Sequence, residues 1–152
     1  MLAALLRCFA GYLVACLTAG LVQVFFVLPP HELVFAGADL LSAAGIWLLL
    51  ATVHSAIFGA PFSIIALAVA EWRRLKSPIY YAAAGFGIAM LGFLTQITGH
   101  GFTQPLPVTL YLLAAFTCTG VAAGIAYWLV AGRLAGRRGR RKLEHELDAA
   151  TQ

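Results

Sequence analysis

Four long apolar stretches constrain this chain more than any other feature of its sequence. They lie at about residues 5–28, 39–70, 79–98 and 108–131. A helix needs about 20 consecutive apolar residues to cross the ~30 Å hydrocarbon core of a bilayer, and each stretch meets that length. Hydrophobic residues make up 62% of the chain, against about 45 to 50% in soluble domains, so many of them must face lipid. The sequence therefore predicts an all-α membrane protein, a bundle of four transmembrane helices within residues 1–132.

The positions of the basic residues indicate how these spans are oriented. All ten lie in three places: near the N-terminus, in the connector at residues 73–76, and from residue 133 onward. The connectors at residues 29–38 and 99–107 contain no Lys or Arg. Because Lys and Arg accumulate in cytoplasmic segments, we expect both termini to lie in the cytoplasm.

Residues 133–152 are predicted to form a cytoplasmic tail that is first basic and then acidic. Basic side chains next to a membrane attract anionic lipid headgroups. We assign the basic residues to topology and lipid contact, and we expect no nucleic-acid partner. The expected lipid contacts are Arg73, Arg74, Lys76, Arg137, Arg138, Arg140, Arg141 and Lys142.

The second apolar stretch is longer than one crossing requires. As a single helix at ~1.5 Å per residue it would measure about 50 Å. Pro61 lacks an amide donor, so we predict a kink or a break near it. A division there into two spans would give five crossings and would place the 73–76 connector outside, against the charge bias. We therefore predict one crossing from about Leu50 to Ala70, preceded by a helical segment that begins near Asp39 and lies in or above the outer interface.

Small residues recur at four-residue spacing within the spans, which lets helix backbones approach closely. This spacing predicts a compact bundle, but it does not separate contacts within one chain from contacts with a partner. The residues are Gly11, Ala15 and Ala19; Ala51, Ser55 and Gly59; Ala83 and Gly87; and Gly120 and Gly124.

His54 is the ionisable residue that falls well inside an apolar stretch. Such residues are costly in hydrocarbon and usually face the bundle interior. A proton or ion path through His54 would also use Gln23, Gln96 and Asp39, which the predicted topology places at the same outer depth. Two structural roles remain open: His54 bonded to a neighbouring hydroxyl or carbonyl, and Asp39 as the N-cap of a helix.

The histidines are also the candidates for a metal site, because imidazole together with carboxylate suits zinc, copper or iron. His31, His54 and His100 are all predicted near the outer face. No two of them have the i, i+4 spacing of ligands on one helix, so we predict no bound metal or cofactor.

Catalytic signatures such as H-E-x-x-H, G-x-S-x-G, a P-loop or a dinucleotide fingerprint are absent from the sequence. We therefore expect that the protein is not an enzyme.

Two segments carry a resemblance to a protein family. They are Ala-Glu followed by a basic loop and a Tyr pair at residues 70–81, and Tyr-Trp-x-x-Ala-Gly-Arg at residues 127–133 within the stretch 126–137. They resemble segments of small, uncharacterised four-helix inner-membrane proteins of rhizobial-type alphaproteobacteria. The resemblance implies four helices in a bacterial inner membrane and carries no activity with it.

Three functions are compatible with the sequence. The first is a non-catalytic accessory or scaffold subunit of a membrane complex, whose partner is another membrane protein or a second copy. The second is a small transporter, channel or proton-coupled carrier that uses His54. The third is a haem- or metal-binding membrane protein.

Overall fold

The computed structural model describes residues 2–29, 31, 37–73, 75, 77–100 and 106–134. These residues form four long helices and a short 3-10 helix: α1 Leu2–Val27, α3 Ala38–Arg73, α4 Pro78–His100, α5 Leu106–Val130 and η1 Gly132–Leu134.

Each long helix contains a stretch that is long and apolar enough to cross a membrane. The stretches are Leu5–Val27, Ala38–Ala70, Pro78–Thr98 and Val108–Val130. The ends of the four apolar stretches read from the sequence lie within one residue of these, and the predicted fold class is confirmed: the chain is all-α, with four helices that can each cross a membrane. The agreement is close because length and hydropathy alone decide which segments can span a bilayer.

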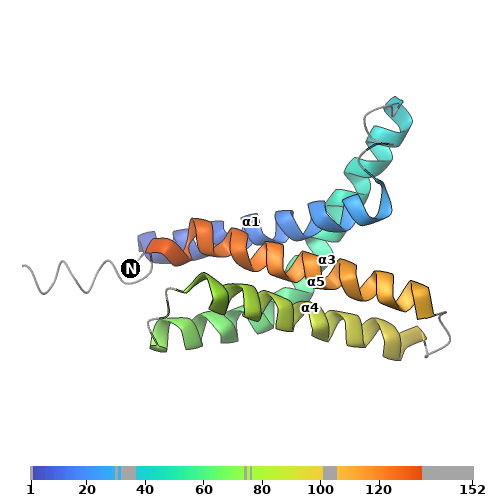
Figure 1. The fold of residues 1–152 in the computed structure, drawn as a ribbon. Helices are drawn as coiled ribbons and strands as arrows, with labels where there is room; N and C mark the ends of the chain where they lie inside the picture. Colours follow the sequence, from blue (N-terminus) through green and yellow to red (C-terminus); the bar gives the residue numbers. More distant parts are fainter. Residues whose placement is uncertain are drawn as a thin grey trace, which may run out of the picture.

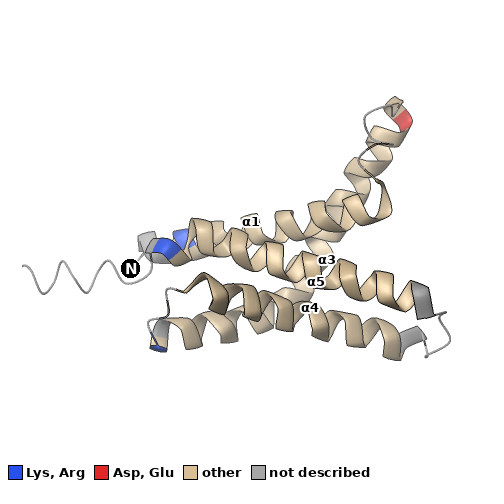
Figure 2. Cartoon of the chain, in the orientation of Figure 1, with Lys and Arg blue, Asp and Glu red and all other residues tan. Residues whose placement is uncertain are grey.

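Helix α5 lies at the centre of the bundle and packs along both α1 and α4, whereas α3 packs mainly on α1 and touches α4 little. Figure 1 shows α1, α5 and α4 side by side, with α3 crossing behind them and diverging at one end. The described basic side chains are those of Arg7, Arg73 and Arg133, and the described acidic side chain is that of Asp39. Figure 2 shows the basic residues at one end of the bundle, here called the basic end, and the acidic residue at the opposite end.

Backbone contact between α4 and α5 explains why these two helices pack so closely. A Cβ added at Gly124 would overlap the backbone of Tyr81, and one added at Gly120 would overlap the backbone of Gly85. Such close approach lets dispersion and weak Cα–H contacts stabilise the pair where lipid supplies no hydrophobic drive. The predicted packing role of Gly120 and Gly124 is confirmed.

The predicted small-residue stripe of α4 does not pack against another helix of this chain. Ala83 and Gly87 are exposed, and a Cβ added at Gly87 would meet nothing within 4 Å. Gly85 and Ala89, which have the same four-residue spacing on a different face of α4, contact Gly120 of α5 instead. Spacing identified the motif, but α4 carries the motif twice.

The best-packed part of the bundle lies at the basic end. Tyr81 and Tyr127 stack there with their ring centroids 5.5 Å apart, and Ala70 and Ala131 complete a buried cluster. At the opposite end α3 has no buried residue between Gly37 and Phe58. The bundle is therefore tight at its basic end and loose at the other.

Helix α3 is continuous through Pro61, so the structure has one helix where the five-crossing alternative requires two. Figure 1 shows that α3 changes direction partway along its length. The Tyr12 hydroxyl of α1 donates to the Ala56 carbonyl, and the Tyr80 hydroxyl of α4 donates to the Ala66 carbonyl at 2.8 Å. These two bonds hold α3 on either side of Pro61 and supply donors that lipid cannot.

Candidate functional site: a central cavity

A cavity of about 370 Å³ lies between the four long helices. This volume falls within the range of about 300 to 1,000 Å³ that is typical of small-molecule sites. Half of the lining residues are Ala, Gly and the two phenylalanines Phe58 and Phe116. The polar or sulfur-bearing residues of the lining are Tyr12, Cys16, Gln23, His54, Ser55, Ser63, Tyr81, Thr95, Gln96, Thr119 and Tyr127.

Three of the residues predicted for a proton or ion path line this cavity: Gln23, His54 and Gln96. Gln23 Nε2 donates to Ser55 Oγ at 3.3 Å, which joins α1 to α3. The His54 imidazole is exposed and lies parallel to the Phe58 ring, with the centroids 6.4 Å apart. The three polar residues that the sequence singled out thus line one cavity from three different helices.

Asp39 does not belong to this group. It is exposed in the first turn of α3, 15 residues before His54, which corresponds to about 22 Å along a helix. Since α3 begins at Ala38, Gly37 takes the cap position that we predicted for Asp39. The carboxylate still lies where the helix dipole favours negative charge.

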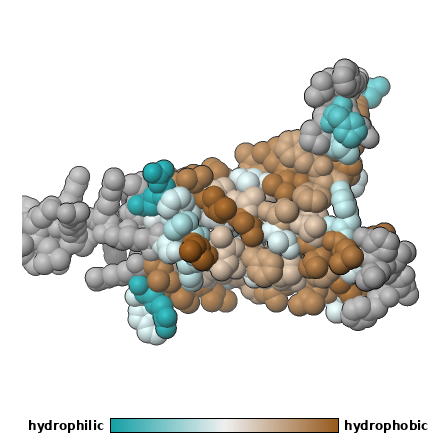
Figure 3. Space-filling view, viewed as in Figure 1, coloured by the Kyte–Doolittle hydropathy of each residue, from teal (hydrophilic) through white to brown (hydrophobic). Residues whose placement is uncertain are grey.

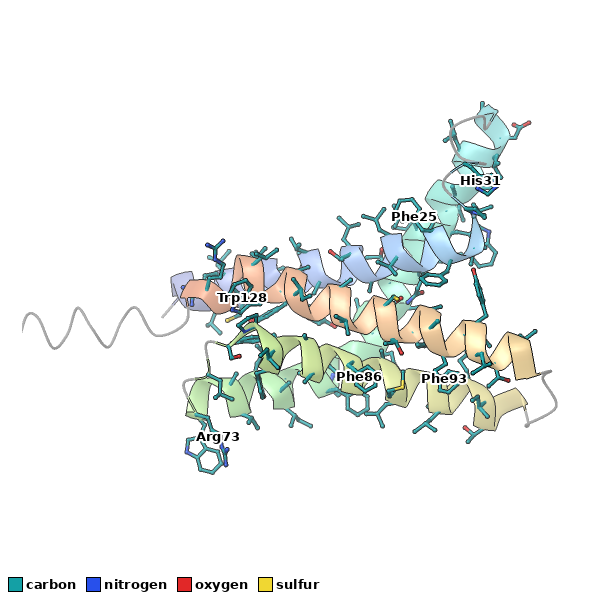
Figure 4. The ribbon with its side chains drawn as sticks, in the orientation of Figure 1. Phe25, His31, Arg73, Phe86, Phe93 and Trp128 are labelled. Atoms are coloured by element: carbon teal, nitrogen blue, oxygen red, sulfur yellow. The ribbon has the colours of Figure 1, made fainter. Side chains whose placement is uncertain are left out.

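The candidate metal ligands are spread over the structure. His54 lines the cavity, whereas His31 is exposed at the opposite end from Arg73 (Figure 4). His100 ends α4, and its side chain lies outside the described residues. Within the described part of the chain, no three His, Cys, Asp or Glu side chains are placed to hold a metal ion.

Thr119 is the site residue that sequence reasoning missed. Its side chain is 5% exposed and lines the cavity, and Oγ1 has no hydrogen-bond partner. Thr117, two residues earlier on α5, instead donates to the Leu113 carbonyl at 2.8 Å. Several threonines occur in the spans, and nothing in the sequence marks this one as unpartnered.

The cavity is closed by aromatic residues at one end and is weakly bounded on one side. Tyr81 and Tyr127 line it at the basic end. Near the opposite end, Tyr111 of α5 packs edge-on against Phe26 of α1 and donates to its carbonyl. Because α3 and α4 make few contacts, the seam between them is the weakest boundary of the cavity.

Of the predicted lipid-contacting residues, Arg73 is described, and it is exposed at the basic end. At the same end Arg133 lies over the Trp128 ring, 5.6 Å from its centroid, a cation–π geometry common at membrane interfaces. The other predicted contacts lie outside the described residues: Arg74, Lys76, Arg137, Arg138, Arg140, Arg141 and Lys142.

The helices and their surface define a multi-pass integral membrane protein. Figure 3 shows apolar side chains over the middle of the molecule, with hydrophilic side chains towards its ends. Comparison with protein-family models, curated proteins and solved structures found no match. The resemblance to small four-helix membrane proteins is therefore supported as far as the four helices and their spans, and no family is identified.

Proposed function

We propose that the chain is a non-catalytic subunit of a larger membrane assembly and that the first part of α3 contacts its partner. This part, residues 38–47 and here called the α3 arm, precedes Leu48 and Thr52, which contact Gly20 of α1. Leu41, Ile46 and Trp47 of the arm are all more than half exposed. The arm diverges from the other helices in Figure 1.

The length of α3 carries this proposal. Its apolar span of 33 residues corresponds to about 50 Å of helix. Even a tilt of about 40°, the upper end of the usual range, shortens the span only to about 38 Å along the membrane normal, against a ~30 Å core. Part of the apolar helix thus extends past the hydrocarbon core, and its apolar side chains must be shielded from water there.

The composition of the α3 arm favours contact with another protein over a position in the membrane interface. An interfacial helix has one polar face along its length, but the arm is polar only at Asp39 and Ser42, in its first turns. Ile46 and Trp47 are followed by Leu48, and three consecutive apolar residues at 100° spacing leave no continuous polar face. A helix of another membrane protein that also extends past the hydrocarbon core would cover this surface.

The test is purification from the native membrane in mild detergent, with mass spectrometry of the proteins that stay bound. We expect one partner at near-equal amount. The double variant Ile46→Ala, Trp47→Ala should lose it by about tenfold or more, as truncation of interface anchors does. The matched control is Ile64→Ala, Ile65→Ala, because these adjacent residues on α3 are 68% and 63% exposed but lie outside the arm. Recovery of the chain alone, or only with itself, would refute the proposal.

We further propose a bacterial inner membrane, with both termini and the basic end in the cytoplasm. The convergence of Arg7, Arg73 and Arg133 at one end of the bundle supports this orientation, because cytoplasmic segments are enriched in Lys and Arg. Contacts of exposed Arg73 with anionic headgroups would add about 1 kcal/mol per basic residue.

A second candidate function is a small proton-coupled carrier that uses His54. The position of the imidazole on the cavity, which Gln23 and Gln96 also line, favours it. In liposomes with a trapped pH-sensitive dye, His54→Ala should abolish proton flux. His31→Ala should leave the flux intact, because His31 lies outside the cavity lining. Unchanged flux in the His54 variant would remove this residue from the mechanism.

A further inference from the structure

We propose that the central cavity binds a neutral, mostly apolar small molecule that has one hydrogen-bonding group, and that this group pairs with Thr119. This inference names a ligand class for the carrier proposed as the second candidate function. Transport of the ligand rests on that proposed function, whereas binding of the ligand does not. It is independent of the partner contact of the α3 arm, since no arm residue lines the cavity.

The cavity owes its volume to small residues on helices that are already fixed in place. Gly85, Gly120 and Gly124 line it, and their backbones form the close contact between α4 and α5. These two helices cannot approach further, so the space beside them cannot collapse by that route. The cavity, of about 370 Å³ and open on one side, leaves its lining atoms without packing partners from the chain itself, which an apolar ligand would supply.

The lining favours a neutral ligand. No Asp, Glu, Lys or Arg is among the residues that line the cavity in the described part of the chain. A permanent charge at this depth would lose its hydration without gaining a counter-ion, which is strongly unfavourable. The rings of Phe58 and Phe116 are suited instead to apolar or aromatic groups.

One polar atom in the cavity requires a partner. Thr119 Oγ1 is buried without a hydrogen bond, whereas Gln23 and Ser55 already bond to each other. A threonine hydroxyl can both donate and accept, so a ligand hydroxyl, carbonyl or amide would satisfy it. A lipid acyl chain has no such group and would leave Oγ1 unpaired.

The seam between α3 and α4 supplies a route of entry. These two helices make few contacts, and the cavity lining includes residues of both, such as Phe58 and Gly92. An apolar molecule concentrates in the bilayer and would reach the cavity sideways through this seam.

Cys16 provides a reporter for occupancy, because it is buried and lines the cavity. In a variant with Cys8→Ala and Cys118→Ala, labelling of Cys16 by the neutral reagent N-ethylmaleimide is followed by mass spectrometry of the detergent-purified full chain. We expect 2-naphthol to slow the labelling by about fivefold or more at saturation. Naphthalene-2-sulfonate, which has a similar ring but a permanent charge, should not slow it.

Thr119→Val tests the hydrogen bond, because valine keeps the shape and removes the hydroxyl. One hydrogen bond corresponds to about three- to tenfold in affinity, so protection by 2-naphthol should weaken by that factor. Protection by naphthalene, which has no hydroxyl, should be unchanged. Thr117→Val is the control, since Thr117 lies on the same helix but does not line the cavity.

Four results would overturn the inference: no labelling of Cys16 without a probe, no protection by 2-naphthol, equal protection by the sulfonate, or unaltered protection in the Thr119 variant. Helical content measured by circular dichroism confirms that each variant is folded. If 2-naphthol protects Cys16 while His54→Ala leaves proton flux intact, binding stands and the carrier function fails.

Discussion

Gly124→Leu is expected to destroy the packed bundle, with a loss of about 3 kcal/mol or more. Overpacking usually costs about 1 to 3 kcal/mol. The cost is larger here because the obstacle is the backbone of Tyr81, which cannot rotate aside as a side chain can. The α4–α5 contact is the most extensive in the structure, so forcing it apart exposes the core cluster around Tyr81 and Tyr127 as well. Thermal unfolding in detergent, read by size-exclusion chromatography, measures the effect.

Gly87→Leu is the matched control for that experiment. It makes the same chemical change on α4, but a Cβ at Gly87 has nothing within 4 Å, so the leucine would only face lipid. We expect its melting temperature to stay near that of the parent. Equal losses for the two variants would show that glycine helps these helices for a reason other than close packing.

Labelling of engineered cysteines should give an all-or-none measure of the orientation. In a background with the three native cysteines replaced by alanine, Gly37→Cys should react with a membrane-impermeant maleimide on intact spheroplasts. Ser77→Cys should react only after permeabilisation. Both positions are exposed, and the space around Gly37 is open, so neither substitution should disturb the fold. The physical reason for the difference is the location of Arg73 at the basic end, since Lys and Arg are enriched on the cytoplasmic side.

The opposite labelling pattern would place the basic end outside and would contradict the orientation proposed above. Labelling of both positions from outside would show that the two ends of α3 lie on the same side of the membrane. That result would contradict a single crossing by α3 and hence the four-crossing topology.

The sequence was sufficient to predict the spans and the glycines of α5 that pack on α4, but not the face of α4 that packs on α5. The lipid-facing side of a membrane helix is as apolar as its packed side, so length and hydropathy mark the span while periodicity carries little information. On α4 the choice lay between the stripe of Ala83 and Gly87 and that of Gly85 and Ala89. Only the position of α5 separates them.

Depth explains what could be predicted of the cavity. Counting residues from the span ends placed Gln23, His54 and Gln96 near one level, and all three line the cavity. Thr119 could not be found in this way, because its significance lies in a missing hydrogen-bond partner rather than in its residue type. The absence of a partner depends on the rotation of α5, which the sequence pattern does not encode.

The uneven packing gives the molecule two mechanical parts. Helices α1, α5 and α4 form a stiff slab, held by continuous contact along α5. Helix α3 packs on α1 but touches α4 little, and the Tyr12 and Tyr80 hydroxyls donate to its carbonyls on either side of Pro61. Because α3 is attached mainly along α1, the softest deformation of the bundle is a rocking of α3 that changes its distance from α4. This motion would widen or narrow the seam between α3 and α4, while the glycine contact between α4 and α5 stays unchanged.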